Sequence, residues 1–230
     1  MIHDRKVIAL VPIKEHSERV KNKNFLSFCG EPLYHHILKT LENTYAVDEV
    51  IINTDSPLVM DEAPGLFPKV NVIERPKELR GDHVSVNKLI EHDLTVINAN
   101  IYLQTHATNP LLKAETIGKS LKLFVENEDK YDSLFSVNRF QSRFYDKDCR
   151  PINHNPDTLI RTQDLDSIYE ENSNLYIFTK ESFNKNIRRI GEAPMIYEMS
   201  KIESIDIDDE FSFHLAETLA LFTHEQFKKI

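Results

Sequence analysis

The sequence predicts an α/β protein built on a doubly wound, mostly parallel β-sheet. Three observations lead to this prediction. Short apolar runs alternate with longer amphipathic segments through the first half of the chain. The first run, Val7–Val11, is uninterrupted, as expected of a central strand that is buried on both faces. The length of 230 residues suits a single α/β domain with room for one additional arm.

The individual elements follow from the spacing of apolar residues. The expected strands are Val7–Val11, Glu49–Asn53, Val70–Ile73, Ile101–Thr105 and Ser133–Val137. Leu33, Ile37 and Leu41 share one side of a helix, and the expected helices are Pro32–Leu41, His83–Val96 and Ala114–Glu126. Alternating strands and helices imply right-handed crossovers, and such sheets bind ligands beyond the carboxyl ends of their strands.

The stretch from about Asn138 to Ile168 interrupts this alternation. It is polar, and it contains Pro151 and Pro156 together with scattered aromatic residues. A structureless loop of that length is unusual in a compact domain, so we expect residues 139–170 to form a projecting arm that packs on a second subunit. After the arm we expect strands at Asn174–Phe178 and Glu203–Asp208 and a helix at Phe211–Phe222, all within a single domain of residues 1–230.

Composition excludes several classes of protein. The formal charge of -9 argues against a general nucleic-acid binder, because such proteins depend on a basic surface. Cys29 and Cys149 form no CxxC pair, which argues against a structural zinc site and favours a reducing cytoplasm. The apolar run near the N-terminus is too short to span a membrane, so we expect no membrane association.

The loop after the first strand is strongly cationic. Four basic residues lie within ten positions, namely Lys14, Arg19, Lys21 and Lys23. Because cations and N–H donors must converge on a triphosphate, the loop is a candidate phosphate cradle. Glu15 and Glu18 support the alternative of a solvated turn with balanced charge. Neither a Walker pattern nor a dinucleotide fingerprint is present.

A second candidate site lies near the end of the chain. On a strand, Asp206 and Asp208 share one face about 7 Å apart, and the isoleucines between and before them face the other side. Two carboxylates at a strand end can hold Mg²⁺ together with substrate phosphates. The alternative is a solvated strand end, with Asp209 as the N-cap of the following helix.

The cationic loop also carries a family resemblance. Residues 11–32 (VPIKEHSERVKNKNFLSFCGEP) resemble the opening signature of the acylneuraminate (CMP-sialic acid) and 3-deoxy-manno-octulosonate cytidylyltransferases. Lys14 stands where that family has its first arginine, and Glu15–His16 replaces a glycine pair. Ser17, Lys23 and Asn24 match the family, and Arg19 matches an SxR variant. The resemblance implies that Lys14, Ser17 and Asn24 bind the nucleotide and that Arg19, Lys23 and Asp208 serve catalysis.

Two middle segments resemble the same family. Residues 75–82 (RPKELRGD) are similar to a segment that surrounds the cytosine and ribose, which implies nucleotide contacts by Arg75, Asp82 and Ser85. Asp82 also suits the N-cap of the next helix. In residues 101–111 (IYLQTHATNPL), His106 occupies the position of the family's sugar-binding glutamine, and Gln104 is a second candidate for contact with the acceptor. A structural role for the histidine is the alternative.

A later segment, RTQDL followed by YEENSNLY, resembles the family's RRQDL and YxxNGAIYI motifs. The resemblance implies acceptor contacts by Arg161, Gln163 and Asn172. Ser173 and Asn174 replace the Gly-Ala of the family, and a pairing of Arg161 with Asp164 or Glu170 is the structural alternative for that arginine.

The motifs occur in family order over nearly the whole chain. The resemblance therefore implies a Rossmann-like, GT-A-like fold of the nucleotide-diphospho-sugar transferases and a cytoplasmic homodimer. It also implies Mg²⁺-dependent transfer of CMP from CTP to a 2-keto-3-deoxy sugar acid, with the metal on Asp206 and Asp208. Departures from the family near the acceptor, at Asn109 and Leu112 among others, leave a phosphonate or phosphorylated alcohol open as acceptor. A non-catalytic homologue that binds sugar nucleotides is also open. A hydrolase that uses Ser17 or another serine with a histidine partner is not supported, because the sequence lacks the nucleophile-elbow pattern.

Overall fold

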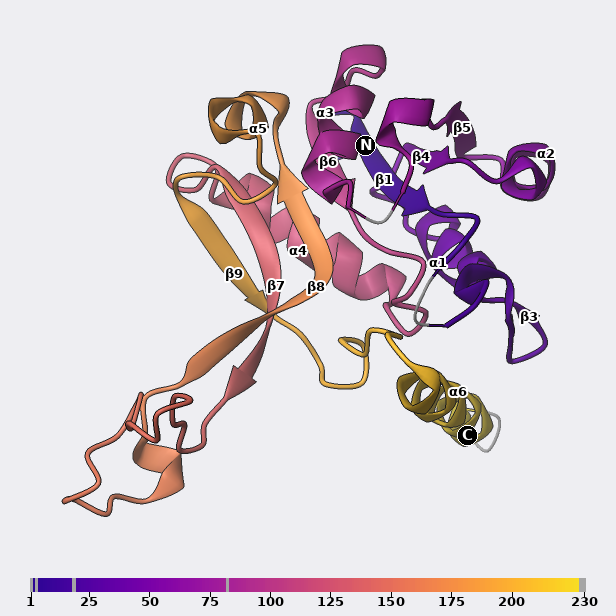
Figure 1. The fold of residues 1–230 in the computed structure, drawn as a ribbon. Helices are drawn as coiled ribbons and strands as arrows, with labels where there is room; N and C mark the ends of the chain where they lie inside the picture. The colour runs from indigo at the N-terminus through magenta and orange to yellow at the C-terminus, as the bar shows by residue number, and fades with distance from the viewer. Residues whose placement is uncertain (1, 3, 18–19, 82, 228–230) are drawn as a thin grey trace.

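A computed structural model describes residue 2 and residues 4–17, 20–81 and 83–227, with side chains through residue 222. Within these residues the main sheet has seven strands in the order β5-β4-β1-β6-β8-β7-β9, and a small hairpin of β2 (Ser27–Phe28) and β3 (Glu31–Pro32) lies apart from it (Figure 1). The sheet is flanked by helices on both faces. The predicted α/β class and doubly wound sheet are confirmed.

The first half of the sheet is parallel. Its strands are β1 (Val7–Ile13), β4 (Glu49–Thr54), β5 (Val70–Glu74) and β6 (Ile101–Gln104). Strand β1 pairs in parallel with β4 on one side and with β6 on the other. Their carboxyl ends therefore meet at one edge, as the apolar runs predicted.

The second half contains the arm. Strand β8 (Ile168–Phe178) runs antiparallel to both β6 and β7 (Ser133–Phe140), and β9 (Pro194–Glu198) pairs in parallel with β7. Strands β7 and β8 extend beyond the rest of the sheet as a two-stranded stalk that carries the loop between them (Figure 1). The expected projection is present, and the packing of this arm on a second subunit stays a prediction.

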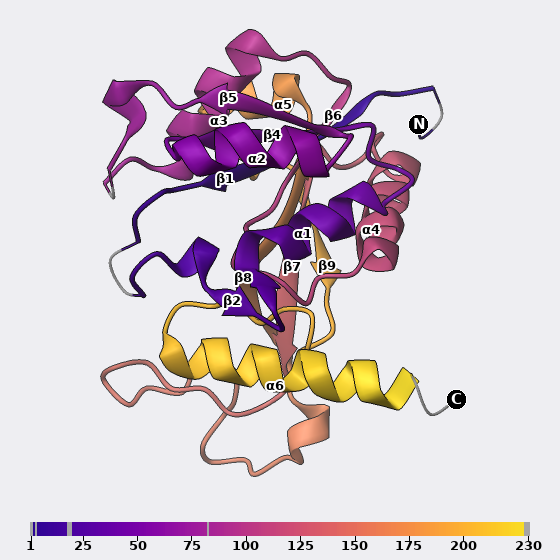
Figure 2. The same cartoon turned by 90° about the vertical axis from the view of Figure 1, so that its right-hand side faces the viewer.

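Helices cover the sheet in two layers. They are α1 (Leu33–Glu42), α2 (Pro57–Leu66), α3 (Val86–Val96), α4 (Ala114–Glu126) and α5 (Lys180–Asn186), whereas α6 (Glu210–Phe227) lies apart from the sheet. Alternate residues of β1 enter two separate cores: Val7 and Ala9 pack with α1, α2 and α4, whereas Ile8 packs with α3 and α5. Figure 2 shows α1 and α2 on the face turned toward the viewer. This division explains why β1 is apolar at every position.

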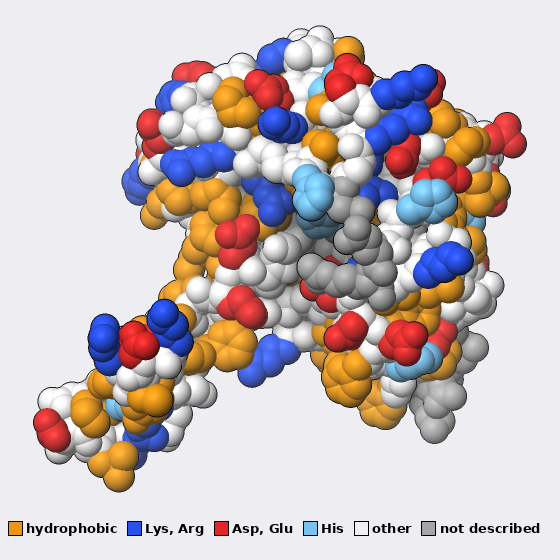
Figure 3. Space-filling view, viewed as in Figure 1, with side chains coloured by type: hydrophobic (Ala, Val, Ile, Leu, Met, Phe, Trp, Pro, Cys, Tyr) orange, Lys and Arg blue, Asp and Glu red, His pale blue; other side chains and the backbone are white. Residues whose placement is uncertain are grey.

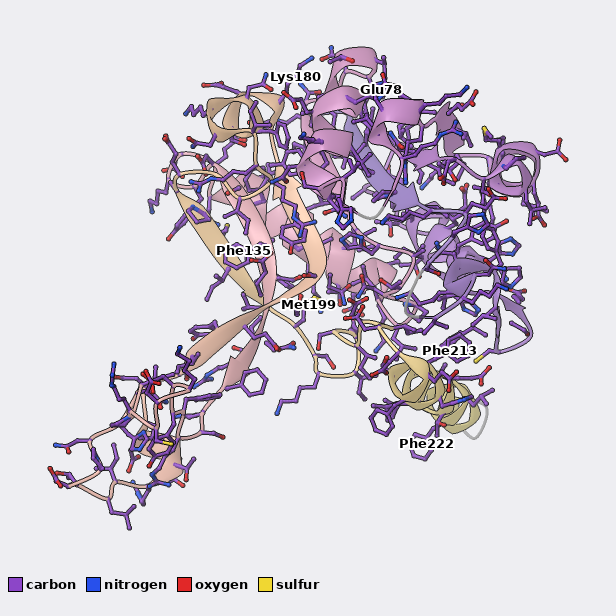
Figure 4. The ribbon with its side chains drawn as sticks, in the orientation of Figure 1. Glu78, Phe135, Lys180, Met199, Phe213 and Phe222 are labelled. Carbon is purple, nitrogen blue, oxygen red and sulfur yellow. The ribbon has the colours of Figure 1, made fainter. Side chains whose placement is uncertain are left out.

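Helix α6 lies below the main body, and its described side chains pack through one side of the helix. Phe213 is buried beside Phe28, and Ile207 joins the same small cluster. Phe222, nine residues further on, is on the opposite side of the helix and is exposed (Figure 4). The cluster attaches α6 and the segment before it to the β2-β3 hairpin.

The predicted strand at Glu203–Asp208 is wrong. Residues 201–204 form a turn, and residues 205–208 have no regular secondary structure. Among the described residues, the backbone bond that joins this segment to the body runs from Ile207 N to Thr108 O and is 2.9 Å long. Strand β6 is already paired on both sides, so it has no free edge for another strand. The alternation of the segment survives, because Ile205 and Ile207 still pack into the α6 cluster.

Smaller differences concern helix limits and missed elements. Helix α3 begins at Val86 with Ser85 as its N-cap, three residues later than His83, and α6 continues five residues past Phe222. Helices α2 and α5 and strand β9 were not expected from the sequence. Among the described residues, no helix is both long enough and apolar enough to cross a membrane.

Candidate functional site

A cavity of about 340 Å³ lies beyond the carboxyl ends of β1 and β6. Its walls come from the loop after β1, the loop after β6 and the segment before α6. The described residues that line it are Pro12, Lys14, Ser17, Val20, Lys23, Asn24, His106, Ala107, Thr108 and Asp208. Histidine and basic side chains border the middle of the face in Figure 3. The structure thus brings the cationic loop and Asp208 to one place.

The loop after β1 is braced by its own polar side chains. Ser17 Oγ donates to Val20 O at 2.7 Å and accepts from Lys23 N at 3.0 Å. Asn24 is buried, and its Nδ2 donates to Lys14 O at 3.0 Å. Both residues therefore shape the loop that presents the cations, in addition to the nucleotide contacts predicted for them.

Lys23 joins this loop to the segment before α6. Its side chain is only 11% exposed, and Nζ donates to Ile207 O and lies 3.9 Å from Asp208 Oδ1. The carboxylate of Asp208 is largely exposed at the cavity wall. A cation and a carboxylate therefore stand side by side where a ligand with charged phosphates could enter.

The three aspartates before α6 have different surroundings. Asp206 is partly buried, and its Oδ1 lies 3.5 Å from Asn109 Nδ2. Asp209 accepts a bond from Ser212 N at 2.7 Å, which is the predicted N-cap contact. Bonds from Ser212 hold the pKa of Asp209 below its ordinary value. Asp209 therefore caps the helix, and Asp206 and Asp208 remain the candidates for a metal.

The carboxylate oxygens of Asp206 and Asp208 are donors of the type that Mg²⁺ binds. The described residues contain no group of three or more His, Cys, Asp or Glu side chains that could hold a metal by themselves. Mg²⁺ differs from metals that need such a cage, because one or two carboxylates, waters and substrate phosphates complete its shell. The pair Asp206 and Asp208 beside an open cavity suits a metal that arrives with a nucleotide.

The loop after β6 places His106 in the cavity wall. Gln104 is fully buried, and its Nε2 lies 3.0 Å from His106 Nε2. Burial, and then the nearby cations of Arg189 and Lys23, lower the pKa of His106 to about 3. The imidazole is consequently neutral at physiological pH, and it contributes hydrogen bonds to the cavity instead of charge.

Arg189, on the loop before β9, was not identified from the sequence. Its Nη1 donates to Gln104 Oε1 at 2.6 Å, and its guanidinium lies 3.5 Å from the centre of the Tyr176 ring. The dipeptide Arg188–Arg189 gave no sign of this role, since adjacent basic residues are common on exposed loops. Only the packing of the loop against β6 and β8 reveals it.

Two predicted nucleotide contacts lie away from the cavity lining. Arg75 is 1% exposed, and its guanidinium donates to Asn53 Oδ1 at 2.8 Å, to Asn53 O at 2.7 Å and to Ile13 O at 3.2 Å. It therefore ties the carboxyl ends of β1 and β4 together. Ser85 is exposed at the start of α3. Nucleotide contacts by these two residues stay predictions.

Asn172 lies in an irregular part of the β7–β8 pairing. Its Oδ1 accepts from Ser136 Oγ at 2.5 Å, and its Nδ2 donates to Asn138 Oδ1 at 3.2 Å. The next residue, Ser173, has a φ of 56°, in the left-handed region where glycine is favoured. This backbone geometry accounts for the glycine that the resembled family carries there, and the acceptor contact of Asn172 stays a prediction.

The remaining predicted residues are in the arm or outside the described residues. Arg161 and Gln163 lie in the arm, where Arg161 Nε donates to Asp164 Oδ2 at 2.7 Å. The predicted pairing of Arg161 with Asp164 is therefore present, and the acceptor contacts of Arg161 and Gln163 stay predictions. The arm projects away from the body (Figure 1), and neither residue is among the described residues that line the cavity. Arg19 and Asp82 lie outside the described residues.

Comparisons with known proteins agree on one family. The chain is 26% identical over 231 residues to the N-acylneuraminate cytidylyltransferase of Escherichia coli O18:K1:H7, an alignment that spans 93% of this chain and 52% of the relative. It is 22% identical to the pseudaminic acid cytidylyltransferase of Campylobacter jejuni, over 96% of this chain and 98% of the relative. It thus spans about half the length of the first protein and nearly all of the second.

Solved structures support the fold. CMP:2-keto-3-deoxy-manno-octonic acid synthetase, solved in complex with CTP, matches with a TM-score of 0.68 at 12% identity, over 95% of this chain and 99% of the other. A 4-diphosphocytidyl-2C-methyl-D-erythritol synthase from Anaerococcus prevotii matches with a TM-score of 0.65 at 11% identity, over 94% and 96%. A family model described as cytidylyltransferase matches residues 8–228. The chain therefore belongs to the cytidylyltransferase family.

Proposed function

We propose that this protein transfers CMP from CTP to a 2-keto-3-deoxy sugar acid of the sialic, pseudaminic or legionaminic type and releases pyrophosphate. Three relatives named for such acids support the acceptor class, including the CMP-N,N'-diacetyllegionaminic acid synthase of Legionella pneumophila, 24% identical over 96% of this chain. The observation that carries the proposal is the approach of Lys23 to Asp208 at the wall of one cavity.

The proposed reaction is a direct displacement at phosphorus. The anomeric hydroxyl of the acid attacks the α-phosphorus of CTP, the bond to the β-phosphate oxygen breaks, and the hydroxyl proton passes to solvent. In such transfers the protein contributes positioning and electrostatic stabilisation. The position of Lys14 and Lys23 in the cavity wall supports a role for both in stabilising the departing pyrophosphate, and Arg19 lies between them in the sequence.

Asp206 and Asp208 are the residues that would hold Mg²⁺. A bound Mg²⁺ supplies positive charge against the nucleotide phosphates. The arrangement gives Asp208 a second task, because its carboxylate lies near Lys23 Nζ and limits where that cation can move. Asn109 Nδ2 lies 3.5 Å from Asp206 Oδ1 and limits where that carboxylate can move.

Pyrophosphate release with Mg²⁺ tests the proposal directly. CTP should support turnover with one or more sugar acids, whereas ATP, GTP and UTP should not. A panel that also includes a phosphonate and a phosphorylated alcohol distinguishes the acceptor classes. Turnover with those acceptors alone would contradict the sugar-acid proposal, and CTP binding without turnover on any acceptor would identify a non-catalytic homologue.

The Asp208→Asn variant tests the metal assignment. We expect it to lower turnover by on the order of 100-fold, with a much smaller effect on CTP binding. The reason is that the carboxylate would hold the Mg²⁺ whose positive charge offsets the negative charge that develops during displacement. The matched control is Asp129→Asn, an exposed aspartate after α4. Equal rates for the two variants would refute the role of Asp208.

A further inference from the structure

The surroundings of Arg189 are unusually restrictive for a residue on a surface loop. Its side chain is 17% exposed, stacks on the Tyr176 ring and lies with Nη2 3.7 Å from Glu171 Oε1. Its Nη1 donates to the buried Gln104 at 2.6 Å. Because the guanidinium is planar and cannot lose its proton, these contacts fix both its place and its role as donor.

The loop that carries Arg189 is held as firmly as the side chain. Gly191 N donates to Ser133 Oγ at 2.8 Å, and the Asp132 carboxylate accepts from Glu192 N at 2.9 Å and from Ala193 N at 3.1 Å. A Cβ atom at Gly191 would overlap the Asp132 carboxylate. The loop therefore has little freedom to withdraw Arg189 from Gln104.

The donor property of Arg189 determines how Gln104 is oriented. The amide atom that faces Arg189 must accept a hydrogen bond, so it is the carbonyl oxygen. The amide nitrogen then faces the other way, where it donates to Thr105 O at 2.9 Å. The same nitrogen lies 3.0 Å from His106 Nε2.

The orientation of Gln104 in turn determines the tautomer of His106. An amide N–H points at Nε2, and Arg189 Nη1, also a donor, lies 3.5 Å from the same atom. Nε2 must therefore accept, and the single proton of the neutral ring sits on Nδ1. In the described part of the chain the hydrogen bonds of this ring go to Nε2, which leaves Nδ1–H for a ligand in the cavity that the ring lines.

We propose that Arg189 is a positioning residue: through Gln104 it holds His106 in the Nδ1–H tautomer, so that His106 donates a hydrogen bond to an oxygen atom of the acceptor. The relay from Arg189 to His106 stands on the geometry alone. The identity of the acceptor as a sugar acid, whose carboxylate and hydroxyl oxygens accept such a bond, rests on the proposed function. Arg189 thereby becomes a determinant of acceptor affinity without touching the acceptor itself.

Nitrogen-15 NMR of the histidine side chains tests the relay without any substrate. The His106 signals are assigned by their loss in His106→Gln. We expect the wild-type ring at pH 7 to be the Nδ1–H tautomer, and we expect Arg189→Met to give a mixture with the Nε2–H form. Gln104→Glu keeps a partner for Arg189 but turns an acceptor toward His106, so it should move the proton to Nε2. An Nε2–H ring in the wild type, or an unchanged tautomer in both variants, would overturn the proposal.

Kinetics then test the consequence for the acceptor. Arg189→Met should raise the acceptor KM roughly ten-fold, the cost of about one hydrogen bond, and leave the CTP KM within about two-fold of the wild type. Arg188→Met, at the exposed neighbouring arginine, is the control and should change neither. An active wild type with an unchanged acceptor KM in Arg189→Met would overturn the inference alone. A wild type inactive on every acceptor would overturn the proposed function, and the NMR result would still decide the relay.

Discussion

Lys23 shows how one side chain can connect two parts of a site that are far apart in sequence. It begins the short helix Lys23–Phe25 in the loop after β1, and its ammonium group reaches Ile207 O and Asp208 at the other end of the chain. The side chain is nearly buried although the group is charged. A buried ammonium must be well supplied with acceptors, and the carbonyl and the carboxylate meet this need.

Replacement of Lys23 should therefore damage catalysis. We expect Lys23→Ala to lower kcat/KM for CTP by on the order of 100-fold, because a charge-assisted contact to the departing phosphates is lost in a partly enclosed site. The control is Lys21→Ala, an exposed lysine in the same loop that lies outside the described cavity lining. Steady-state pyrophosphate release measures both, and an effect of less than two-fold for Lys23→Ala would refute its role.

The lowered pKa of His106 predicts how the stability of the protein depends on pH. Its pKa falls from the ordinary 6.5 to about 3 in the folded protein, chiefly because of burial. Below pH 6.5 the unfolded chain therefore binds a proton that the folded chain does not. The free energy of unfolding consequently decreases as the pH falls. The free energy of unfolding of the wild type should decline relative to that of His106→Gln between pH 7 and pH 5. Urea unfolding at several pH values measures the difference, and a constant difference would contradict the pKa shift.

At the scale of elements, the sequence predicted the parallel half of the sheet best. Uninterrupted apolar runs such as Ile8–Val11 identify strands buried on both faces, and the helices between them have clear one-sided spacing. Helix α2 was missed because Pro64 and Gly65 interrupt its pattern near the end. Strand β9 is half exposed, and its short alternation is not distinguishable from a loop without its neighbour β7.

The candidate site likewise contains residues that the sequence predicted and one that it did not. Charge near strand ends was visible in the sequence, so Lys23 and Asp208 could be predicted to meet. The role of Arg189 depends on tertiary packing over 83 to 85 positions of separation from His106 and Gln104, and no local pattern encodes it. The false strand at residues 203–208 shows the reverse error, since a correct alternation does not reveal that β6 has no open edge.

Two glycines in different elements should respond oppositely to the same substitution. Gly191→Ala should destabilise the protein by about 2 kcal/mol, because its Cβ overlaps the Asp132 carboxylate that holds the loop before β9. Gly65→Ala, in α2 with open space around it, should stabilise by roughly 0.5 kcal/mol through helix propensity. Urea unfolding of both variants measures these changes, and destabilisation of equal size would show that the Asp132 contact is not the cause.

At the scale of the whole molecule, the arm has exposed apolar side chains that no contact within a single chain covers. It carries exposed apolar side chains at Tyr145, Ile152, Leu159 and Ile160. It also carries Arg161 and Gln163, which the family resemblance associates with the acceptor but which are not among the described residues that line the cavity. We propose that the arm packs on a second copy of the chain and brings these two residues to the partner's cavity.

The mass in solution tests the first part of this proposal. Light scattering should give twice the chain mass of 26.8 kDa, and Leu159→Asp should shift the protein toward the monomer by placing a charge in the apolar contact. The control is Leu58→Asp, which alters an exposed leucine on α2, in the body. A monomeric wild type would refute the dimer.

Mixing two inactive variants tests whether the arm completes the partner's site. Asp208→Asn removes a group from the cavity, and Arg161→Ala removes one from the arm. If Arg161 acts in the partner's cavity, a mixed dimer contains one site with neither defect. Half of the dimers in an equal, fully exchanged mixture are mixed, so about a quarter of the wild-type rate should return. Asp208→Asn mixed with Lys23→Ala should recover almost nothing if both residues act in the cavity of their own chain, because every site then keeps a defect. Recovery confined to the first mixture is the expected result, whereas equal behaviour of the two mixtures would mean that each chain builds its site alone.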